Sequence, residues 1–426
     1  MTWPRLKHLL PTRRVAVIFF AALAVRLAYW AVYLRHYVPI SDAKHYEGIA
    51  RYLAAGQGFS HLYPSGTLHP TAFRPPLYPL LLGAVYAVFG AHLALAQLLN
   101  ALIGSANVVI GSTLASRVGG RRAGLAAAIA LAVFPPLVAN DLVPLSEPLS
   151  LMLFLVTASF LASRRYELAA LASGLLVLGR SSAQGVVALV AVWLVFSVGW
   201  RIAAKYAVIA VLVVTPWLVR NEIQMHTLGL VTSDGFNVAA IYSPEARQSY
   251  PKLQFVDPAY DQRFAAHWSL KVDEARWDHF LLQRGISGIQ QDPGRIPGLL
   301  RSHLAQVFEF HPKLNVAAER SDGRNLPLRN HTMWLFYGVT VLGLMGLWRH
   351  RRSRDVQFLA GLAGYFVLMA ALFVPAPRLR APLDIVCCIG VGLLFVPRRR
   401  AASVDLREPP APAAVDGPML GDPLPV

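Results

Sequence analysis

The feature that most constrains the fold is a series of apolar blocks, each long enough to cross a lipid bilayer. Segments of about 20 apolar residues with few charges are the signature of transmembrane helices. The chain has 426 residues, of which 55% are hydrophobic and only 15% charged. A soluble domain of this size rarely has such a composition. The sequence therefore predicts an α-helical integral membrane protein.

Ten of these blocks are interpreted as transmembrane helices. They cover residues 15–34, 93–115, 123–139, 148–162, 168–179, 185–199, 206–219, 331–348, 356–374 and 381–396. The first is too long for a signal-peptide core and lacks a small-residue cleavage site, so we interpret it as a retained span. The apolar segment 76–89 is shorter, and its length is typical of a dipping or juxtamembrane helix.

The basic residues indicate how these spans are oriented. Basic clusters lie at residues 5–14, 117–122, 164–165, 201–205, 349–354 and 398–400. If 76–89 does not span, all of these clusters fall on one side, and the positive-inside rule makes that side cytoplasmic. The net charge of +17 then reflects membrane topology, and no nucleic-acid partner is expected.

Two long polar segments are predicted to lie outside the cytoplasm. The N-terminal transmembrane region, residues 1–219, contains the first external loop at 35–92, which is expected to carry amphipathic helices. Residues 220–330 hold 13 basic and 12 acidic residues against 27 and 11 in the remainder. This near-neutral segment is predicted to be an external, periplasmic domain that is mainly helical.

Within that domain, residues 260–284 are expected to form a helix, with Phe264, Trp268, Trp277 and Phe280 as its apolar candidates. A C-terminal transmembrane region follows at 331–400. The tail, 401–426, is rich in proline and alanine and is predicted to be a disordered cytoplasmic segment.

Two carboxylates are placed where a transmembrane enzyme could use them. Asp42 begins a predicted amphipathic helix after the first span, with Tyr46, Ile49 and Leu53 on its apolar stripe. Glu147 lies at the external mouth of a span, where a carboxylate is costly unless it is paired or functional. The alternatives are a helix N-cap for Asp42 and stabilisation of the helix dipole by Glu147. Asp141 is a weaker candidate nearby.

Several arginines depart from the positive-inside pattern by lying on the outer side. They are Arg74, Arg180, Arg220, Arg378 and Arg380. The planar guanidinium group fits phosphate oxygens in a bidentate manner. Each arginine alone could be a membrane anchor, but their shared face favours a site for a lipid phosphate.

Other catalytic motifs are not found in the sequence. The histidines show no HxxxH or HExxH spacing, so a zinc site is unsupported. The chain has no GxxxxGK[ST] motif and no Rossmann glycine pattern, so a nucleotide cofactor is unsupported as well. A donor already attached to a lipid carrier needs neither.

At this point the chain resembles the GT-C glycosyltransferases, in the bacterial branch related to protein O-mannosyltransferases and to the aminoarabinose transferases that modify lipid A. The resemblance covers residues 15–400. The motifs that carry it, in the family's order, are SDAKHYEGIA, FRPPLYPLLLG, GRRAGLAAAIALAVFPPL, SEPLSLMLF, TPWLVRN and PRLRAPL. Asp42 and Glu147 match the family's two acidic positions, and Arg74 matches a basic residue before the dipping segment.

The resemblance implies transfer of a sugar from a polyprenyl-phosphate carrier to a lipid, glycan or protein acceptor of the cell envelope. The site would face the periplasm from the bacterial inner membrane, among membrane lipids, with the N-terminus in the cytoplasm. Asp42 is expected to act as the base of an inverting reaction, with help from Glu147, while the five outer arginines bind the donor phosphate. Tyr46, His69, Tyr78 and Asp141 are candidate substrate contacts.

Two points remain open. The family often has two adjacent acids in the first loop, but Ala43 follows Asp42 here. A divalent cation is therefore possible but unsupported by ligand spacing, and no cofactor is assigned. The alternative function is a non-enzymatic transporter or flippase of lipid-linked or acidic solutes, for which charges near the bilayer midplane would be expected.

Overall fold

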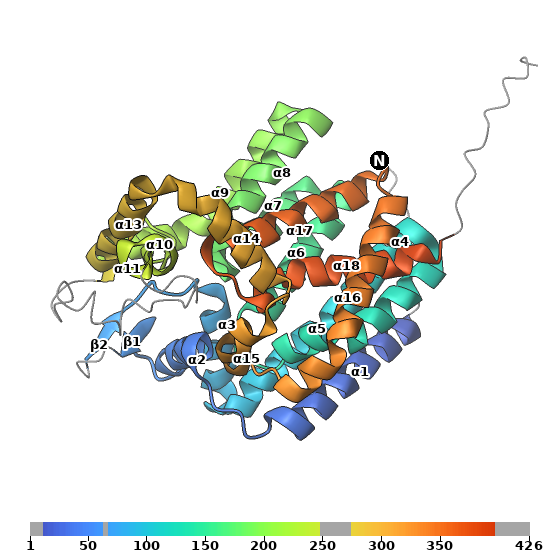
Figure 1. The fold of residues 1–426 in the computed structure, drawn as a ribbon, viewed down its shortest axis with the longest axis horizontal. Coiled ribbons are helices and arrows are strands. Elements are labelled where there is room, and N and C mark those ends of the chain that lie inside the picture. The colour runs from blue at the N-terminus through green and yellow to red at the C-terminus, as the bar shows by residue number, and fades with distance from the viewer. Residues whose placement is uncertain (1–11, 63–66, 248–273, 397–426) are drawn as a thin grey trace, which may run out of the picture. The chain divides into compact units, whose positions relative to one another are not determined.

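The computed structural model describes residues 12–62, 67–247 and 274–396, and it is built almost entirely of helices (Figure 1). The first half contains α1 (Thr12–Tyr29), η1 (Trp30–Leu34), α2 (Ser41–Ala54), β1 (Ser60–Leu62), β2 (Leu68–Pro70), α3 (Leu77–Phe89), α4 (Leu93–Val133), α5 (Pro135–Asn140), α6 (Glu147–Ala162), α7 (Tyr166–Gly179), η2 (Ser181–Ala183), α8 (Gln184–Ser197) and α9 (Trp200–Met225).

The second half of the chain contains the remaining helices, in chain order. They are α10 (Asp234–Tyr242), α11 (Pro244–Arg247), α13 (Glu274–Gln291), η3 (Pro293–Arg295), α14 (Ile296–Val307), η4 (Pro312–Asn315), α15 (Val316–Ser321), α16 (Leu326–Arg349), α17 (Arg354–Phe373), η5 (Pro377–Arg380) and α18 (Ala381–Leu394). The predicted disordered tail, 401–426, lies outside the described residues.

Four helical stretches in the described part of the chain are long and apolar enough to cross a membrane. They are Arg13–Leu34, Leu93–Val133, Trp200–Met225 and Arg354–Phe373, and shorter apolar helices occur at Leu77–Phe89, Glu147–Ala162, Tyr166–Gly179 and Ser181–Ser197. Large apolar side chains such as Phe20, Phe196 and Leu212 are exposed on these helices, which is the arrangement expected against lipid. The chain is a helical membrane protein, and the count of ten spans stays a prediction.

The α4 helix contains two of the predicted spans, joined at Gly120. This glycine has a φ of 76°, which interrupts the helix. Ser112 Oγ donates to Gly124 O at 2.9 Å, and a Cβ on Gly111 would meet the Leu131 side chain. In a straight helix residues 111 and 131 would be about 30 Å apart. The chain therefore reverses at Gly120, as expected for two antiparallel spans.

The α18 helix packs against both α4 and α16 (Figure 1). Small residues allow the close approach, because a Cβ on Gly343 would clash with the backbone of Cys387 and a Cβ on Gly346 would clash with Gly390. Cys387 and Cys388 are buried and free. This contact fixes the position of α18, whose N-terminal end carries η5 and its arginines.

The described part of segment 35–92, after the first predicted span, folds as α2 and α3 packed together, with a short antiparallel β1–β2 pair. The apolar stripe predicted for α2 is confirmed, since Tyr46, Ile49 and Ala50 are buried. The α3 helix corresponds to the predicted dipping segment, and its 13 residues would span only about 20 Å.

The region after α9 is helical, as expected, and it contacts the first loop. Thr71 Oγ1 donates to Glu274 Oε2 at 2.7 Å, and Ala72 N donates to Glu274 Oε1 at 2.9 Å. The helix expected at 260–284 is observed from Glu274 to Gln291 as α13, where Trp277 is buried and stacks on Phe280. Residues 260–273, with Phe264 and Trp268, lie outside the described residues.

Candidate active site

Three carboxylates meet around one arginine, Arg378. Its Nη2 donates to Asp42 Oδ2, its Nη1 lies 3.1 Å from Asp322 Oδ1, and its Nε lies 3.5 Å from Glu147 Oε1. The three acids come from the start of α2, the loop after α15 and the first residue of α6. The fold therefore brings together the two acids predicted from the sequence and adds a third.

Each of these side chains is held at the end of a helix. The backbone turns into α2 at Ser41, which has a φ of 51°, so Asp42 lies in the first helical turn. Glu147 opens α6 directly before Pro148, a residue that favours a helix start. Arg378 lies in η5, the short turn that precedes α18. Helix starts carry a partial positive charge, which favours the two carboxylates there.

Arg74 is the second arginine on Asp42. Its Nη2 donates to Asp42 Oδ1 and also to His45 Nδ1, the latter at 3.0 Å. Burial, Arg74 and His61 together lower the pKa of His45 to about 3, so the ring is neutral and its Nδ1 can accept this bond. The Arg74 guanidinium also lies 4.9 Å from the Phe73 ring centre and 5.5 Å from that of Tyr46.

The two arginines determine the charge state of Asp42. Burial raises the pKa of its carboxyl, but Arg74 and Arg378 outweigh that effect and hold the pKa well below its usual range. Asp42 is also the most accessible of the three acids, with 24% of its side chain exposed against 6% for Glu147 and 4% for Asp322. An ionised and reachable carboxylate is what a general base requires.

Arg180 is a third arginine of the site and lies beside Glu147. Arg180 Nη1 lies 3.9 Å from Glu147 Oε1, and Arg180 Nε donates to Ser182 Oγ at 3.1 Å. Glu147 and Arg180 line a small pocket that is otherwise mostly apolar, formed by Ser150, Leu151, Phe154, Phe366, Ala381 and Pro382. Within the described residues, Glu147 Oε2 and Ser150 Oγ have no hydrogen-bond partner. Two buried polar atoms at this pocket therefore lack an internal partner in the part of the chain that the structure describes.

Two of the predicted phosphate-binding arginines lie elsewhere. Arg380 is fully buried, with its Nε 3.1 Å from Asp384 Oδ1 and its Nη2 2.8 Å from Glu309 Oε2. Arg220 donates to the backbone oxygens of Thr71 and Phe59, at 2.7 and 3.0 Å. Neither guanidinium group contacts Asp42, Glu147 or Asp322 in the structure, and the assignment of both to the donor phosphate stays a prediction.

The predicted substrate contacts are divided between the site and its surroundings. Tyr46 OH lies 3.1 Å from Ser146 Oγ, and its ring packs edge-on against that of Tyr78. His69 Nε2 lies 2.8 Å from Thr67 Oγ1 on the β1–β2 pair. Asp141 is separate from the Arg378 group, because its Oδ2 accepts from Arg26 Nε and Nη2 at 2.9 and 2.7 Å. Asp141 therefore ties α1 to the end of α5.

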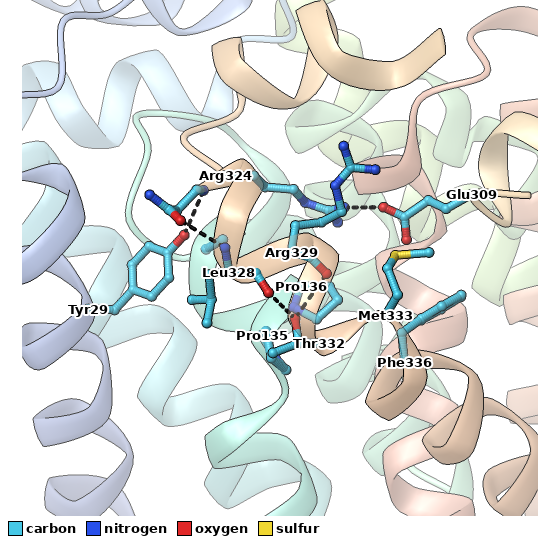
Figure 2. Close-up of a pocket in the computed structure, with 12 residues that line it drawn as sticks. Tyr29, Pro135, Pro136, Glu309, Arg324, Leu328, Arg329, Thr332, Met333 and Phe336 are labelled. Atoms are coloured by element: carbon cyan, nitrogen blue, oxygen red, sulfur yellow. Dashed lines mark hydrogen bonds and ion pairs between the residues drawn. The ribbon is translucent and has the colours of Figure 1, made fainter. Parts of the chain in front are cut away.

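A second buried charge cluster surrounds Glu309, shown in Figure 2 beside a pocket lined by Tyr29, Pro135 and Phe336. Arg324 Nη1 lies 2.8 Å from Glu309 Oε1 and 3.0 Å from Glu319 Oε1, and Arg329 Nη2 lies 3.0 Å from Glu319 Oε2. With Arg380 and Asp384 this makes three arginines and three acids. These ion pairs join α15, α16, η5 and α18 next to the loop that holds Asp322.

No group of three or more His, Cys, Asp or Glu side chains in the described ranges is arranged to hold a metal ion. At the point where the three site carboxylates converge, the Arg378 guanidinium occupies the central position. A cation assignment for this site therefore has no geometric support among these residues.

The helices and the site define a class: a multi-helix membrane protein with arginines and carboxylates gathered at helix ends. No protein-family model and no curated protein matches the chain. It is similar to the solved structure of ArnT from Cupriavidus metallidurans bound to undecaprenyl phosphate, at 16% identity over 90% of this chain and 78% of that chain, with a TM-score of 0.42. The apo-state structure of ArnT gives 16% identity, coverage of 90% and 76%, and a TM-score of 0.40. Both similarities are distant ones, at the level of the fold.

Proposed function

We propose that the chain is a membrane glycosyltransferase that moves a sugar from a polyprenyl-phosphate carrier to an acceptor hydroxyl. The observation that carries the proposal is the placement of Asp42, a partly exposed carboxylate, between Arg74 and Arg378. Two guanidinium groups beside one carboxylate supply both a phosphate-binding surface and a proton acceptor within a single site.

Donor binding prepares Asp42 for catalysis. While Arg74 and Arg378 hold its carboxylate, its pKa is low and it is a weak base. A donor phosphate competes for the same guanidinium groups. As Arg74 turns to the phosphate, Asp42 loses one of its two cationic partners, so its basicity rises and it can accept a proton.

The reaction is a direct displacement. The acceptor hydroxyl gives its proton to Asp42 while its oxygen bonds to the anomeric carbon. The bond from that carbon to the phosphate oxygen breaks, and the arginines stabilise the charge that grows on the leaving phosphate. A single displacement inverts the configuration at the anomeric carbon.

Glu147 positions the acceptor in this scheme. Its Oε2 and Ser150 Oγ line the small pocket beside Arg180 without a partner among the described residues. A hydroxyl of the acceptor can donate to Glu147 there and be aimed at the donor. The proposed orientation follows the basic clusters, with the site and residues 220–330 on the periplasmic face of the inner membrane.

The rival function, transport without chemistry, is favoured by one observation. Arg26 lies within α1 and is almost fully buried, as a charge on a transport pathway would be. Its Nε and Nη2 are both bound to Asp141 Oδ2, however, so this charge is neutralised inside the helix packing. The group at helix ends around Arg378 favours the enzyme.

The test is turnover with purified protein. Incubation with a panel of polyprenyl-phosphate sugars and envelope lipid acceptors should release polyprenyl phosphate and produce a glycosylated acceptor. Movement of the intact lipid-linked sugar across a vesicle membrane, with no phosphate released by any donor, would support the transporter instead.

A further inference from the structure

Each side-chain nitrogen of Arg378 lies near a carboxylate, although Nε has no hydrogen-bond partner among the described residues. Nη2 meets Asp42, Nη1 meets Asp322 and Nε meets Glu147, and these partners come from three separate elements. A phosphate that takes the Nη1 or Nη2 position of Arg378 therefore displaces Asp322 or Asp42 from it. Which carboxylate loses its contact with Arg378 depends on the other partners that each one has.

The charges of the site also balance before a donor arrives. Arg74, Arg180 and Arg378 contribute three positive charges, which Asp42, Glu147 and Asp322 cancel, while His45 is neutral. A phosphodiester adds one negative charge. In a largely buried site an uncompensated charge is expensive, so its entry favours the uptake of a proton.

Asp322 is the acid best placed to take that proton. Asp42 has two arginine partners and Glu147 lies near two, but Arg378 is the one ion-pair partner of Asp322 within the described residues. The other charges that face Asp322 are Glu147, Asp42 and, from its own loop, Arg324. Tyr37 is also close, and its hydroxyl donates to Ser321 O at 2.7 Å. If Arg378 turns away, Asp322 is left with two carboxylates nearby and almost no solvent.

We propose that Asp322 releases Arg378 to the donor phosphate by taking up one proton from solvent when the donor binds. This inference rests on the proposed function and adds its regulation. The ion pair between Asp322 and Arg378 breaks, an O–H bond forms on Asp322, and the freed N–H groups donate to the phosphate. Asp322 touches no reacting atom, so it is a positioning residue.

The pH dependence follows from the state of Asp322. Burial raises the pKa of this carboxyl to about 6, against the lowering effect of Arg378, and Glu147 and Asp42 raise it further. Loss of the Arg378 contact raises it again in the donor complex. Below pH 6 the acid is protonated in both states, so affinity is constant there. Above that pH, donor affinity falls by up to about tenfold per pH unit, because binding must bring in a proton.

The experiment uses the full chain and a polyprenyl phosphate methyl diester, which carries one fixed negative charge and no sugar to transfer. Binding is measured by calorimetry at pH 7 in two buffers of different ionisation enthalpy, which gives the number of protons taken up. The wild-type protein should take up between half a proton and one. Asp322→Asn should take up none and should bind the diester at least about tenfold more tightly than wild type at pH 8.

A matched control is Asp278→Asn. Asp278 lies in α13, and burial raises its pKa to about 7, but its Oδ1 accepts from Gly235 N at 2.7 Å, away from the arginines of the site. This variant should keep the wild-type proton uptake. Binding without proton uptake in the wild-type protein, or uptake that persists in Asp322→Asn, would overturn the inference and leave the proposed function standing. If Asp322→Asn fails to fold, Asp322→Ser takes its place with the same expected loss of proton uptake, and no binding of the diester by any folded form would overturn both.

Discussion

Asp42 and Asp322 show how two carboxylates on the same arginine can have opposite properties. Both contact Arg378. Two arginines outweigh the effect of burial and hold the pKa of Asp42 low, whereas burial with a single ion-pair partner raises the pKa of Asp322. At the scale of the residue, the number of cationic partners and access to water separate the proposed base from the proposed proton-accepting switch.

The first prediction concerns the proposed base. Asp42→Asn keeps the shape of the side chain but removes its basicity. We expect the variant to fold and to bind donor, and to lose at least about 100-fold in turnover, which is the lower range of general base catalysis. Turnover is measured as release of polyprenyl phosphate in detergent. Glu167→Gln, which removes an exposed carboxylate paired with Lys205, is the control and should be fully active. A folded Asp42→Asn protein with near-normal turnover would reduce Asp42 to a structural partner of the arginines.

The second prediction separates two arginines that the sequence grouped together. Arg74→Ala should weaken donor binding by about 1.5–3 kcal/mol, the range for hydrogen bonds to charged groups, without unfolding the protein. Arg380→Ala instead removes the ion-pair partner of Asp384 and one of the two buried arginine partners of Glu309, so it should destabilise the fold by about 3–5 kcal/mol. Donor titrations and thermal unfolding distinguish the two effects. Unchanged donor affinity in Arg74→Ala would contradict the assignment of Arg74 to the phosphate.

The site could be predicted only in part from the sequence. Asp42, Glu147, Arg74, Arg180 and Arg378 were identifiable because each is a charge next to an apolar block. Asp322 gave no such signal, since SDGRN is typical of an ordinary turn. Arg378 and Arg380 could not be told apart either. They lie two residues apart on a 3₁₀ turn, where that spacing points side chains about 240° apart, and only the packed structure shows which one faces Asp42.

At the scale of elements, the periodic spacing of apolar residues predicted the helices, because each helix buries one face against its neighbours. The stripe on α2 is an example, since Tyr46 and Ile49 are the residues that the fold buries. The ends were less predictable: α9 runs on to Met225, beyond the expected end of its span at residue 219. Contacts between distant elements were not predictable, and the bond from Thr71 to Glu274, 203 residues later, is one of them.

The third prediction concerns the pair that ties α1 to the end of α5. Arg26→Ala or Asp141→Ala should each cost about 3–5 kcal/mol, because each leaves a buried charge without its partner. The double variant Arg26→Met with Asp141→Leu should cost much less than the sum of the two. Unfolding measurements in detergent test this non-additivity. The exposed Lys205–Glu167 pair is the control, and its loss should cost under about 1 kcal/mol. Strictly additive costs at Arg26 and Asp141 would show that the two side chains act independently.

At the scale of the whole molecule, the fourth prediction concerns orientation. The basic clusters predict that the first loop and residues 220–330 lie on the same, external side. Single cysteines at the exposed positions Gln57 and Gln290 should react with an impermeant thiol reagent in intact cells. A cysteine at Arg352 should react only after permeabilisation, and the native cysteines are buried. If Gln57→Cys and Gln290→Cys were labelled from opposite sides of the membrane, the number of spans predicted between them would be wrong.

The ion pair between Asp42 and Arg378 joins residues 336 positions apart in the chain. At about 5–20 residues per second of synthesis, the ribosome makes the arginine roughly 17–67 s after the aspartate. During that interval the nascent chain contains Asp42 but not Arg378, the arginine that lies beside all three site carboxylates. Under the proposed function, a chain that terminates before Arg378 lacks the arginine that contacts all three site carboxylates, so it should not turn over donor.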